Sequence, residues 1–368
     1  MREVRRTKMK TRIQRLLCKM KELELDAMLI DSRSNRRYMS GFSGSSAMLY
    51  LTPKRQVLIT DFRYLEQAAK ECPDYEIIDQ GSIGLLRTAL KCASEEGVKS
   101  IGFESSHVSY ATYRSFTEHK AFNFVPTLKV IEDFRKIKDH VELEKLAKAE
   151  HIGDLAFNHI IEFMKNNYRQ GITETDVALE IERVMRKNGA TGTSFDSIVA
   201  TGAKSSLPHA QPGNETFKKG DFVVMDFGCI YEGYCSDMTR TVVIEEASPQ
   251  HVAIYNTVLE AQHKALEAIR PGMKGKEVDE VAREVIARAG YGDHFGHGLG
   301  HSVGLDIHEN PRFSPLEEAI IEVGMCLTVE PGIYIKDFGG VRIEDLVAVT
   351  ETGILNLTHS PKELIVIK

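Results

Sequence analysis

The stretch Asp221–Asp237, DFVVMDFGCIYEGYCSD, decides how the rest of this chain is interpreted. Its apolar run Phe222–Met225 is typical of a buried strand, and the run delivers a carboxylate at Asp226. The glycines that follow indicate a turn, so Asp226 and Asp237 would lie near the same end of an antiparallel hairpin. Two buried acids side by side repel each other unless a cation or hydrogen-bond donors meet them. Taken alone, the stretch fits either a metal site or a surface hairpin with solvated acids.

The chain around this stretch repeats itself with an offset of 101 residues. Each copy combines a loop, a capped amphipathic helix and a terminating glycine, and each follows an earlier helical segment. Residues 134–368 are therefore predicted to be a duplicated α/β (α+β) domain with an internal pseudo-two-fold repeat. A strand with an embedded acid also recurs, since Gly220 precedes Asp226 by six residues as Gly324 precedes Glu330. The positions that match are Arg169 and Arg270, Gly171 and Gly272, Val177 and Val278, Val184 and Val285, and Gly189 and Gly290.

Residues 1–133 are predicted to form a separate, smaller α/β domain. Short apolar runs alternate with helical periodicity, as in a sheet flanked by helices. The Gly- and Ser-rich segment that follows the first run is expected to be a loop or a strand entry. The highly charged segment 133–148 is expected to begin a long exposed helix, so the boundary is placed near residue 134. The expected strands are 26–32, 47–52, 56–61 and 100–103, and the expected helices are 64–72 and 83–93.

The composition is that of an ordinary globular protein. A net charge of -6 gives no reason to expect nucleic acid or an anionic membrane as a partner. No apolar run approaches about 18 residues, so no membrane span is expected. The basic N-terminus predicts a solvated first helix in preference to a transit peptide, with an apolar stripe at Ile13, Leu16, Leu17 and Met20. Six cysteines without paired spacing predict reduced thiols in a cytoplasmic protein; they are Cys18, Cys72, Cys92, Cys229, Cys235 and Cys326.

Four carboxylates and a histidine-rich segment form the candidate site. The repeat pairs Asp226 and Asp237 in the first half with Glu330 and Glu344 in the second. An oxygen-rich set with one or two imidazoles suits Mn²⁺, Fe²⁺ or Co²⁺ better than structural zinc, and four acids can hold two ions. The segment between the two pairs, HFGHGLGHSVGLDIHEN, contains His294, His297, His301 and His308.

Two other interpretations of the histidine segment fit less well. His297 and His301 have the i, i+4 spacing of a helical zinc peptidase, but neighbouring glycines oppose a helix and the Glu of HExxH is missing. Gly298, Gly300 and Gly304 weakly suggest a dinucleotide-binding turn, but no apolar strand precedes them.

Together these motifs resemble the pita-bread-fold metallopeptidases, in particular the Xaa-Pro aminopeptidase and prolidase group. The resemblance covers residues 134–368 and extends to the N-terminal domain through Asn35, Tyr38, SGFSGS and ITDFRY. It implies a pita-bread catalytic domain preceded by a creatinase/prolidase-type domain. Ser302 is a departure, because a glycine is more usual there. The family's Asp, Asp, His, Glu, Glu ligands match Asp226 (VMDFG), Asp237 (YCSDMTRT), His301 (GHSVGLDIHE), Glu330 (TVEPGIY) and Glu344 (VRIEDL).

The resemblance also implies a role for each site residue. Asp226 and Glu344 would bridge two ions, Asp237 would complete one shell, and His301 and Glu330 would complete the other. His308 would donate to the oxyanion with His209 (SSLPHAQP) nearby, and Glu330 would move a proton to the leaving nitrogen. His297 would line a proline subsite, Arg342 would orient Glu344 or bind a substrate carboxylate, and His294 is expected to be a solvated loop residue.

The activity implied is hydrolysis of the Xaa-Pro bond at the N-terminus of short peptides by an Xaa-Pro aminopeptidase. Two divalent ions per chain are expected, Mn²⁺ first and Co²⁺, Fe²⁺ or Zn²⁺ as alternatives, in a homodimer that binds a proline-containing peptide. The first alternative is an Xaa-Pro dipeptidase (prolidase). A methionine aminopeptidase would usually lack the N-terminal domain, and a non-catalytic binding relative would be expected to have lost ligands.

Overall fold

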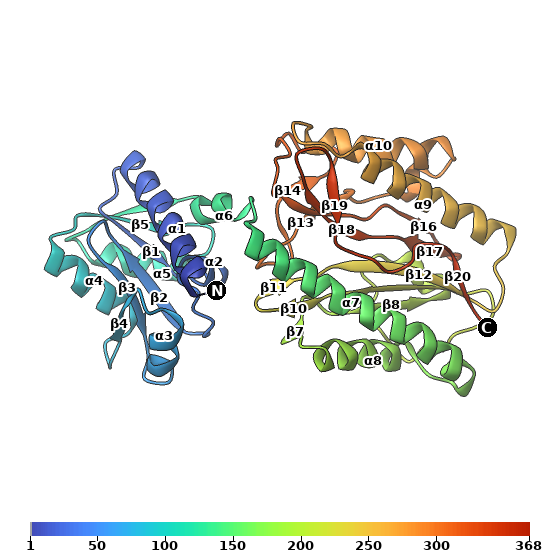
Figure 1. The fold of residues 1–368 in the computed structure, drawn as a ribbon, viewed down its shortest axis with the longest axis horizontal. Helices are drawn as coiled ribbons and strands as arrows, with labels where there is room; N and C mark the ends of the chain where they lie inside the picture. The colour runs from blue at the N-terminus through green and yellow to red at the C-terminus, as the bar shows by residue number, and fades with distance from the viewer. Residues whose placement is uncertain (1) are drawn as a thin grey trace. The chain divides into compact units, whose positions relative to one another are not determined.

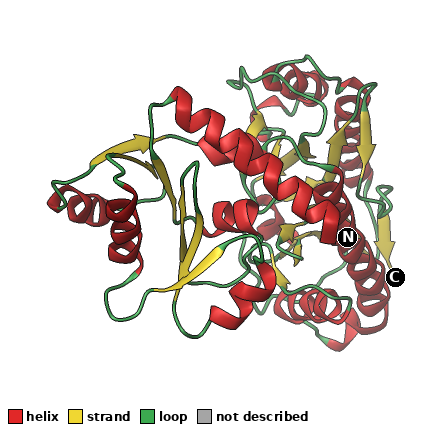
Figure 2. Ribbon diagram, turned by 60° about the vertical axis from the view of Figure 1, so that its left-hand side comes forward, coloured by secondary structure: helices red, strands yellow, loops and turns green. Residues whose placement is uncertain are grey.

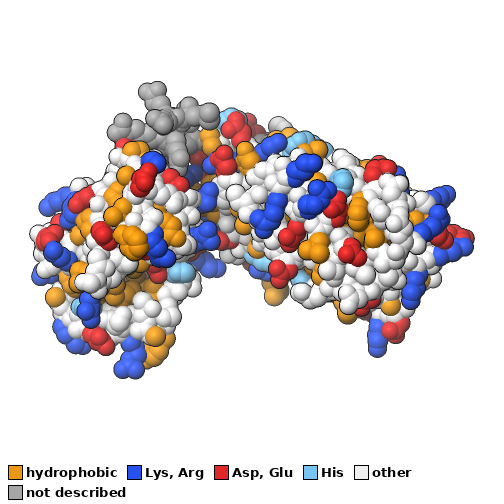
Figure 3. Space-filling model, turned by 90° about the horizontal axis from the view of Figure 1, so that it is seen from below, with side chains coloured by type: hydrophobic (Ala, Val, Ile, Leu, Met, Phe, Trp, Pro, Cys, Tyr) orange, Lys and Arg blue, Asp and Glu red, His pale blue; other side chains and the backbone are white. Residues whose placement is uncertain are grey.

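The computed structural model describes residues 2–368, with side chains from residue 9 onward. The chain divides into two compact units, Met1–Arg135 and Lys136–Lys368, called the N-terminal and C-terminal units below. Among the described residues, none of the helices has the length and apolar character that a membrane crossing requires. On the face drawn in Figure 3, acidic and basic side chains are interspersed over both units.

The N-terminal unit is built on one six-stranded mixed sheet of order β4-β3-β2-β1-β5-β6. β1, β2 and β3 pair antiparallel, whereas β4, β5 and β6 each join a parallel neighbour. One core buries the apolar side of α4 against these strands. The strands are β1 (Ala27–Ile30), β2 (Ala47–Leu51), β3 (Gln56–Thr60), β4 (Glu76–Asp79), β5 (Ser100–Glu104) and β6 (Asn123–Thr127). The helices are α1 (Arg2–Glu22), α2 (Arg33–Ser40), α3 (Leu65–Glu71), α4 (Leu85–Glu96), α5 (Tyr110–Glu118) and α6 (Val130–Arg135).

The expectation of a loop or strand entry between β1 and β2 is wrong, because this segment contains helix α2. Polar side chains fix the helix to the sheet. Arg36 is buried and donates to the carbonyl oxygen of Asp31 at 3.0 Å, and Asn35 donates to Glu104 at 2.7 Å. Glu104 also accepts the backbone N–H of Asp31 just before the helix. A helix with a polar buried face has no hydrophobic periodicity, so the sequence pattern gave no signal for it.

The C-terminal unit consists of two halves, each with two helices beside a sheet that is antiparallel except where β20 joins β12 in parallel. Helices α7 and α8 lie on one side of the strands, and α9 and α10 lie on the other (Figures 1 and 2). The two main sheets have the orders β20-β12-β9-β8 and β14-β13-β15-β18-β19. The first half contains α7 (His140–Asn167), α8 (Glu174–Lys187), β7 (Gly192–Thr193), β8 (Ile198–Thr201), β9 (Phe222–Phe227), β10 (Cys229–Tyr231), β11 (Tyr234–Cys235) and β12 (Met238–Ile244). The second half contains α9 (Pro249–Ala268), α10 (Gly275–Arg288), β13 (Gly300–Ser302), β14 (Glu309–Phe313), β15 (Cys326–Val329), β16 (Gly332–Ile335), β17 (Gly339–Arg342), β18 (Asp345–Val349), β19 (Ile354–Asn356) and β20 (Ile365–Ile367). Three 3₁₀ turns complete the unit: η1 (Tyr168–Gln170), η2 (Gly202–Ser206) and η3 (Gly292–His294).

The predicted repeat is confirmed by equivalent positions in the two halves. Val177 in α8 and Val278 in α10 are both fully buried, each in the core of its own half. Gly171 and Gly272 both adopt positive φ angles, 81° and 94°, which a residue with a Cβ rarely adopts. Both halves therefore use the same turn and the same helix face to build a core.

The opening hairpin is confirmed, with one elaboration. β9 and β12 pair antiparallel with Asp226 opposite Thr239, and Asp237 directly precedes β12. Between them, β10 and β11 leave the main sheet and form a separate small sheet, in which β10 pairs with both β11 and β7. Gly228 makes this departure sterically feasible, because a Cβ there would lie 1.9 Å from the carbonyl oxygen of Ser236.

Buried polar contacts join the two halves along β12. Arg240 is 1% exposed and donates to the carboxylate of Asp345 at 2.7 Å and to the carbonyl oxygen of Glu344 at 2.5 Å. The backbone N–H of Glu344 donates to the carbonyl oxygen of Thr239 at 3.1 Å. We call this line of contacts between the two halves the seam. It brings the chain at Glu344 directly beside β12.

We predict that Arg240→Met destabilises the C-terminal unit by about 1–3 kcal/mol, because the buried carbonyl oxygens of Glu344 and Ser360 lose their donor, although Asp345 keeps Lys362 as a cation at 2.8 Å. The urea-unfolding transition measures this effect. Lys264→Met is the control, because its ion pair with Glu267 is exposed and should contribute less than about 1 kcal/mol. Equal effects of the two substitutions would contradict the role given to Arg240.

Candidate metal centre

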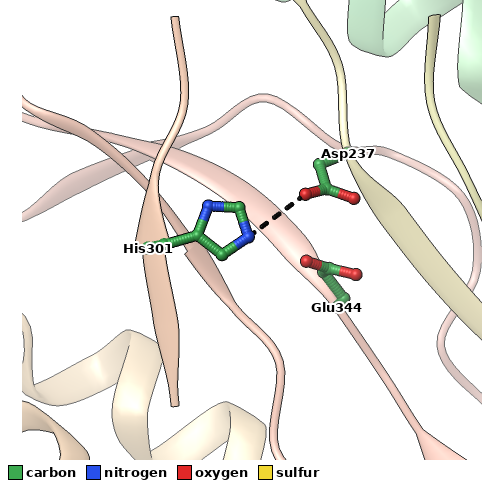
Figure 4. Close-up of side chains that lie close together, drawn as sticks. All are labelled: Asp237, His301 and Glu344. Atoms are coloured by element: carbon green, nitrogen blue, oxygen red, sulfur yellow. Dashed lines mark ion pairs between the residues drawn. The ribbon is translucent and has the colours of Figure 1, made fainter. Parts of the chain in front are cut away.

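Three side chains from both halves of the C-terminal unit meet at the seam. One ligand atom each from Asp237, His301 and Glu344 lies within 4.8 Å of the other two. The side chains point toward one another, and the dashed line in Figure 4 joins His301 Nε2 to Asp237 Oδ2 at 3.4 Å. His301 is carried by β13, whereas Asp237 and Glu344 directly precede β12 and β18. The cluster therefore exists only when both halves are folded.

The other two predicted ligands border the same cluster. Glu330 directly follows β15, and its Oε1 lies 3.6 Å from Nε2 of His301. Asp226 lies in β9 and accepts a hydrogen bond from Arg342 Nη2 at 2.6 Å. The second oxygen of Asp226, Oδ1, is buried and has no hydrogen-bond partner among the described residues. All five predicted ligands are thus brought to one place, and one of them has an unsatisfied oxygen there.

Burial and mutual repulsion make the fully ionised acid cluster unstable without a cation. Burial raises the pKa of Asp237 well above its usual value, and the charges of Glu344 and Asp226 raise it further. The pKa of Glu344 is raised for the same reasons, by burial first and then by Glu330 and Asp226. Burial raises the pKa of Glu330 to about 8, although the nearby charge of Arg342 lowers it.

The orientation and the protonation state of His301 suit a metal ligand. The Nδ1–H of His301 donates to the carbonyl oxygen of Ser302 at 3.2 Å, so the lone pair of Nε2 faces Asp237 and Glu330. Burial lowers its pKa to about 4, which keeps the ring neutral near pH 7. Carboxylate oxygens and one neutral imidazole form a donor set for hard or borderline divalent ions. The described residues therefore fit divalent metal ions.

Two threonines that the sequence analysis missed hold the acids in place. Thr239 Oγ1 donates to Glu344 at 2.6 Å and accepts from Arg342 Nε at 3.0 Å. Thr328 Oγ1 donates to Glu330 at 3.2 Å and accepts the backbone N–H of His301 at 3.0 Å. The sequence did contain a signal for these threonines, because Thr239 lies two positions from Asp237 and Thr328 lies two positions from Glu330. Alternate residues of a strand share a face, so each threonine is expected on the same face as its predicted ligand.

Arg342 contacts Asp226 directly and reaches Glu344 only through Thr239. Its third nitrogen, Nη1, donates to the hydroxyl of Tyr334 at 2.8 Å. Tyr334 in turn lies 3.0 Å from Nε2 of His297. All three nitrogens of Arg342 are thus engaged inside the protein.

The remaining predicted histidines lie at the edge of the cluster. The ring of His308 packs edge-on against that of His301, with 4.5 Å between the centroids. His209 is exposed, and its charge is among the effects that lower the pKa of His297 and of His308, after burial in both cases. His294 does not match the expected solvated residue: it is partly buried, and its Nδ1 donates to the carbonyl oxygen of Tyr334 at 3.1 Å.

The loop that carries His209 is held at its base by Glu174, which the sequence analysis also missed. This buried carboxylate at the start of α8 accepts the backbone N–H groups of Thr201 and Gly213 at 2.8 and 2.9 Å. Lys204 donates to the same carboxylate at 2.5 Å. Glu174 therefore joins the two ends of the loop around His209.

Comparison with known families identifies this architecture. The model of metallopeptidase family M24 matches residues 144–351, and the creatinase/prolidase N-terminal domain matches residues 12–137. The chain belongs to metallopeptidase family M24. This membership confirms the predicted family and the pita-bread fold, and it implies divalent metal ions.

Individual relatives extend over nearly the whole chain. The uncharacterized peptidase YqhT of Bacillus subtilis is 46% identical, covering 94% of this chain and 97% of that protein. The structure of an Xaa-Pro dipeptidase from Bacillus anthracis superposes with a TM-score of 0.93 at 43% identity, covering 97% and 99% of the two chains. An X-Pro aminopeptidase from Thermotoga maritima gives a TM-score of 0.89 at 37% identity, covering 97% and 100%.

We predict that Asp237→Ala lowers the metal content below two ions per chain, because it removes a ligand from the seam. Elemental analysis after dialysis against Mn²⁺ measures the content. Asp293→Ala is the control, since this nearby acid is exposed and belongs to 3₁₀ turn η3. Full occupancy in Asp237→Ala would contradict the ligand assignment.

Proposed function

We propose that this chain hydrolyses the bond between the first residue and proline in short peptides, as an Xaa-Pro aminopeptidase. The observation that carries the proposal is the cluster of Asp226, Asp237, His301, Glu330 and Glu344 at the seam of the two halves. The named relatives support it, because both solved structures are described as peptidases of the Xaa-Pro type.

The carboxylates of Asp226, Asp237, Glu330 and Glu344 and the imidazole of His301 would hold two divalent ions. Such ions lower the pKa of a coordinated water so that it can attack a peptide carbonyl near neutral pH. Thr239 donates to the carboxylate of Glu344 and Arg342 donates to that of Asp226, so these two residues would keep both carboxylates oriented while substrate binds. Mn²⁺ is the ion we propose, with Co²⁺, Fe²⁺ or Zn²⁺ as alternatives that the donor set also accepts.

Two histidines beside the cluster would act on the substrate itself. The pKa of His308 is lowered, first by partial desolvation and then by the charge of Arg312, and its ring N–H can donate to the carbonyl oxygen as negative charge develops. His209, on the neighbouring loop, would reach the same carbonyl. Glu330 would carry a proton to the proline nitrogen as the bond breaks.

The contacts of His297 and Tyr334 support the proposal that His297 lines the subsite for the proline ring. Burial lowers the pKa of His297 to about 4, and its Nδ1–H donates to the carbonyl oxygen of Gly298 at 2.7 Å. The Tyr334 hydroxyl accepts from Arg342 and can therefore donate to His297. This arrangement offers the proline ring a neutral imidazole face in place of a charge.

A dipeptidase restricted to Xaa-Pro is the second candidate, and Arg312 is the observation that favours it. A dipeptidase must bind the free carboxylate of proline, and Arg342 is already engaged by three partners. Arg312 is exposed on β14, and its charge lowers the pKa of His301, His308 and Glu330, after burial and other larger effects. It is also the cross-strand partner of His301 between β13 and β14, so this cation lies on the strand beside the site, where it would bind such a carboxylate.

We further propose a homodimer, as the family resemblance implies, and a cytoplasmic location. All six cysteines are free thiols, and five of them are buried. This pattern supports a reducing compartment.

We predict that removal of metal by a chelator abolishes cleavage of Xaa-Pro peptides and that added Mn²⁺ restores it. The measurement is release of the first residue by chelated and reloaded protein, with metal content determined in parallel. Undiminished turnover in protein shown to be free of metal would contradict the proposed mechanism.

Length selectivity is tested by comparing cleavage of Xaa-Pro with that of Xaa-Pro-Yaa. An aminopeptidase cleaves both, and Arg312→Gln then leaves the ratio of the two kcat/KM values unchanged. A dipeptidase cleaves only Xaa-Pro, and Arg312→Gln then raises KM for the dipeptide, because the carboxylate loses its partner. The second result would replace the aminopeptidase proposal with the dipeptidase.

A further inference from the structure

Glu150 in helix α7 contacts the backbone of the predicted ligand Asp237. Through the hydroxyl of Thr358 it also reaches the chain near the predicted ligand Glu344. Its Oε1 accepts the backbone N–H of Asp237 at 2.7 Å, and its Oε2 accepts Thr358 Oγ1–H at 2.9 Å. Thr358 Oγ1 accepts the backbone N–H of Leu346, two residues beyond Glu344, also at 2.9 Å. A single carboxylate thus links the backbone at Asp237 to the strand that begins beside Glu344.

The backbone at Asp237 needs such an acceptor. Asp237 lies between the end of β11 and the start of β12, where the chain passes from one sheet to another. It is 4% exposed, and a buried N–H outside a ladder must find a partner elsewhere. Glu150 supplies this partner from a helix of 28 residues, so the contact is anchored in a rigid element.

A role in filling space alone would not require a polar side chain at this position. Glu150 is fully buried, and among the described residues no Lys or Arg pairs with it within 4.0 Å. Burying an ionisable group without a cation is unfavourable, and an apolar side chain would fill the same space at lower cost. The position of Glu150 between two ligand-bearing segments gives a reason for its presence.

We propose that Glu150 is a positioning residue for the metal centre, which sets the separation of the Asp237 and Glu344 carboxylates. The proposal rests on the two-metal function proposed above, and it adds that α7 controls the affinity of the centre. Residues that orient metal ligands typically change metal affinity by about 10- to 100-fold when replaced.

Asp154, one turn further along α7, provides a matched comparison. It is 5% exposed and accepts hydrogen bonds from the backbone N–H groups of His359 and Ser360 and from Ser360 Oγ. It therefore holds the same C-terminal segment as Glu150 does. None of its recorded hydrogen bonds reaches β12, β18 or a predicted ligand.

The experiment measures Mn²⁺ affinity of the full-length apoprotein by competition with a chromophoric chelator, together with the melting temperature. The variants are Glu150→Met, Glu150→Gln and Asp154→Leu. We expect Glu150→Met to weaken binding of at least one ion by about 10- to 100-fold. We expect Asp154→Leu to lower the melting temperature by a similar amount while leaving both affinities unchanged.

Glu150→Gln separates positioning from charge. Its amide oxygen can still accept the Asp237 N–H, and its amide N–H can donate to Thr358 Oγ1, so the geometry is retained. We expect the Mn²⁺ affinity of Glu150→Gln to lie within a few-fold of that of the unmodified protein. If Glu150→Met weakened binding only by destabilising the fold, the affinity of Glu150→Gln would not follow the retained hydrogen bonds in this way. The proposal is overturned if Glu150→Met binds Mn²⁺ as tightly as the unmodified protein, or if Asp154→Leu weakens binding equally.

If Glu150→Met does not fold, Thr358→Val decides the matter. It keeps the shape of Thr358 but removes the hydroxyl that joins Glu150 to Leu346, so a smaller loss of affinity is expected. Unchanged affinity in this variant would overturn the proposal. Because the deciding readout is metal affinity and not activity, a failure to cleave Xaa-Pro peptides would overturn the proposed function without deciding the role of Glu150.

Discussion

Electrostatic repulsion among four carboxylates in one buried space is the constraint on which the rest of the site depends. Asp226 and Asp237 come from one half of the C-terminal unit, and Glu330 and Glu344 come from the other. Burial raises the pKa of Asp237, Glu330 and Glu344, and the neighbouring carboxylates raise each of them further. Near neutral pH a protein can keep all four acids ionised in such a cluster only if cations compensate their charge.

The surrounding residues compensate this charge only in part. Arg342 offers one positive charge to the cluster, and His301 is neutral because burial lowers its pKa to about 4. Thr239 and Thr328 add hydrogen bonds but no charge. The negative charge that remains calls for divalent ions, which explains why the family fold and the metal requirement occur together. The duplication explains the shape of the site, since neither half carries enough ligands by itself.

The sequence predicted the repeat from its spacing, and the family resemblance pointed to the five residues that the fold brings together at the seam; that they bind metal stays a prediction. Valines 177 and 278 occupy equivalent buried positions, as an offset of 101 residues implies. Helix α2 and the roles of Glu150 and Glu174 could not be predicted. Their buried side chains are polar, and each finds its partners on segments distant in the chain: Glu150 bonds Thr358, and Asn35 bonds Glu104. Local sequence patterns reveal the apolar faces of helices and strands and the short motifs around predicted ligands. Hydrogen bonds between segments that are distant in the chain appear only in the folded structure.

The central claim is that the seam of the two halves holds a pair of divalent ions. Anomalous X-ray diffraction at the manganese edge, from crystals grown with Mn²⁺, tests it most directly. The account predicts two anomalous peaks per chain, one beside Asp237 and one beside His301 and Glu330, with Asp226 and Glu344 between them. A single peak, or peaks away from these five side chains, would contradict it.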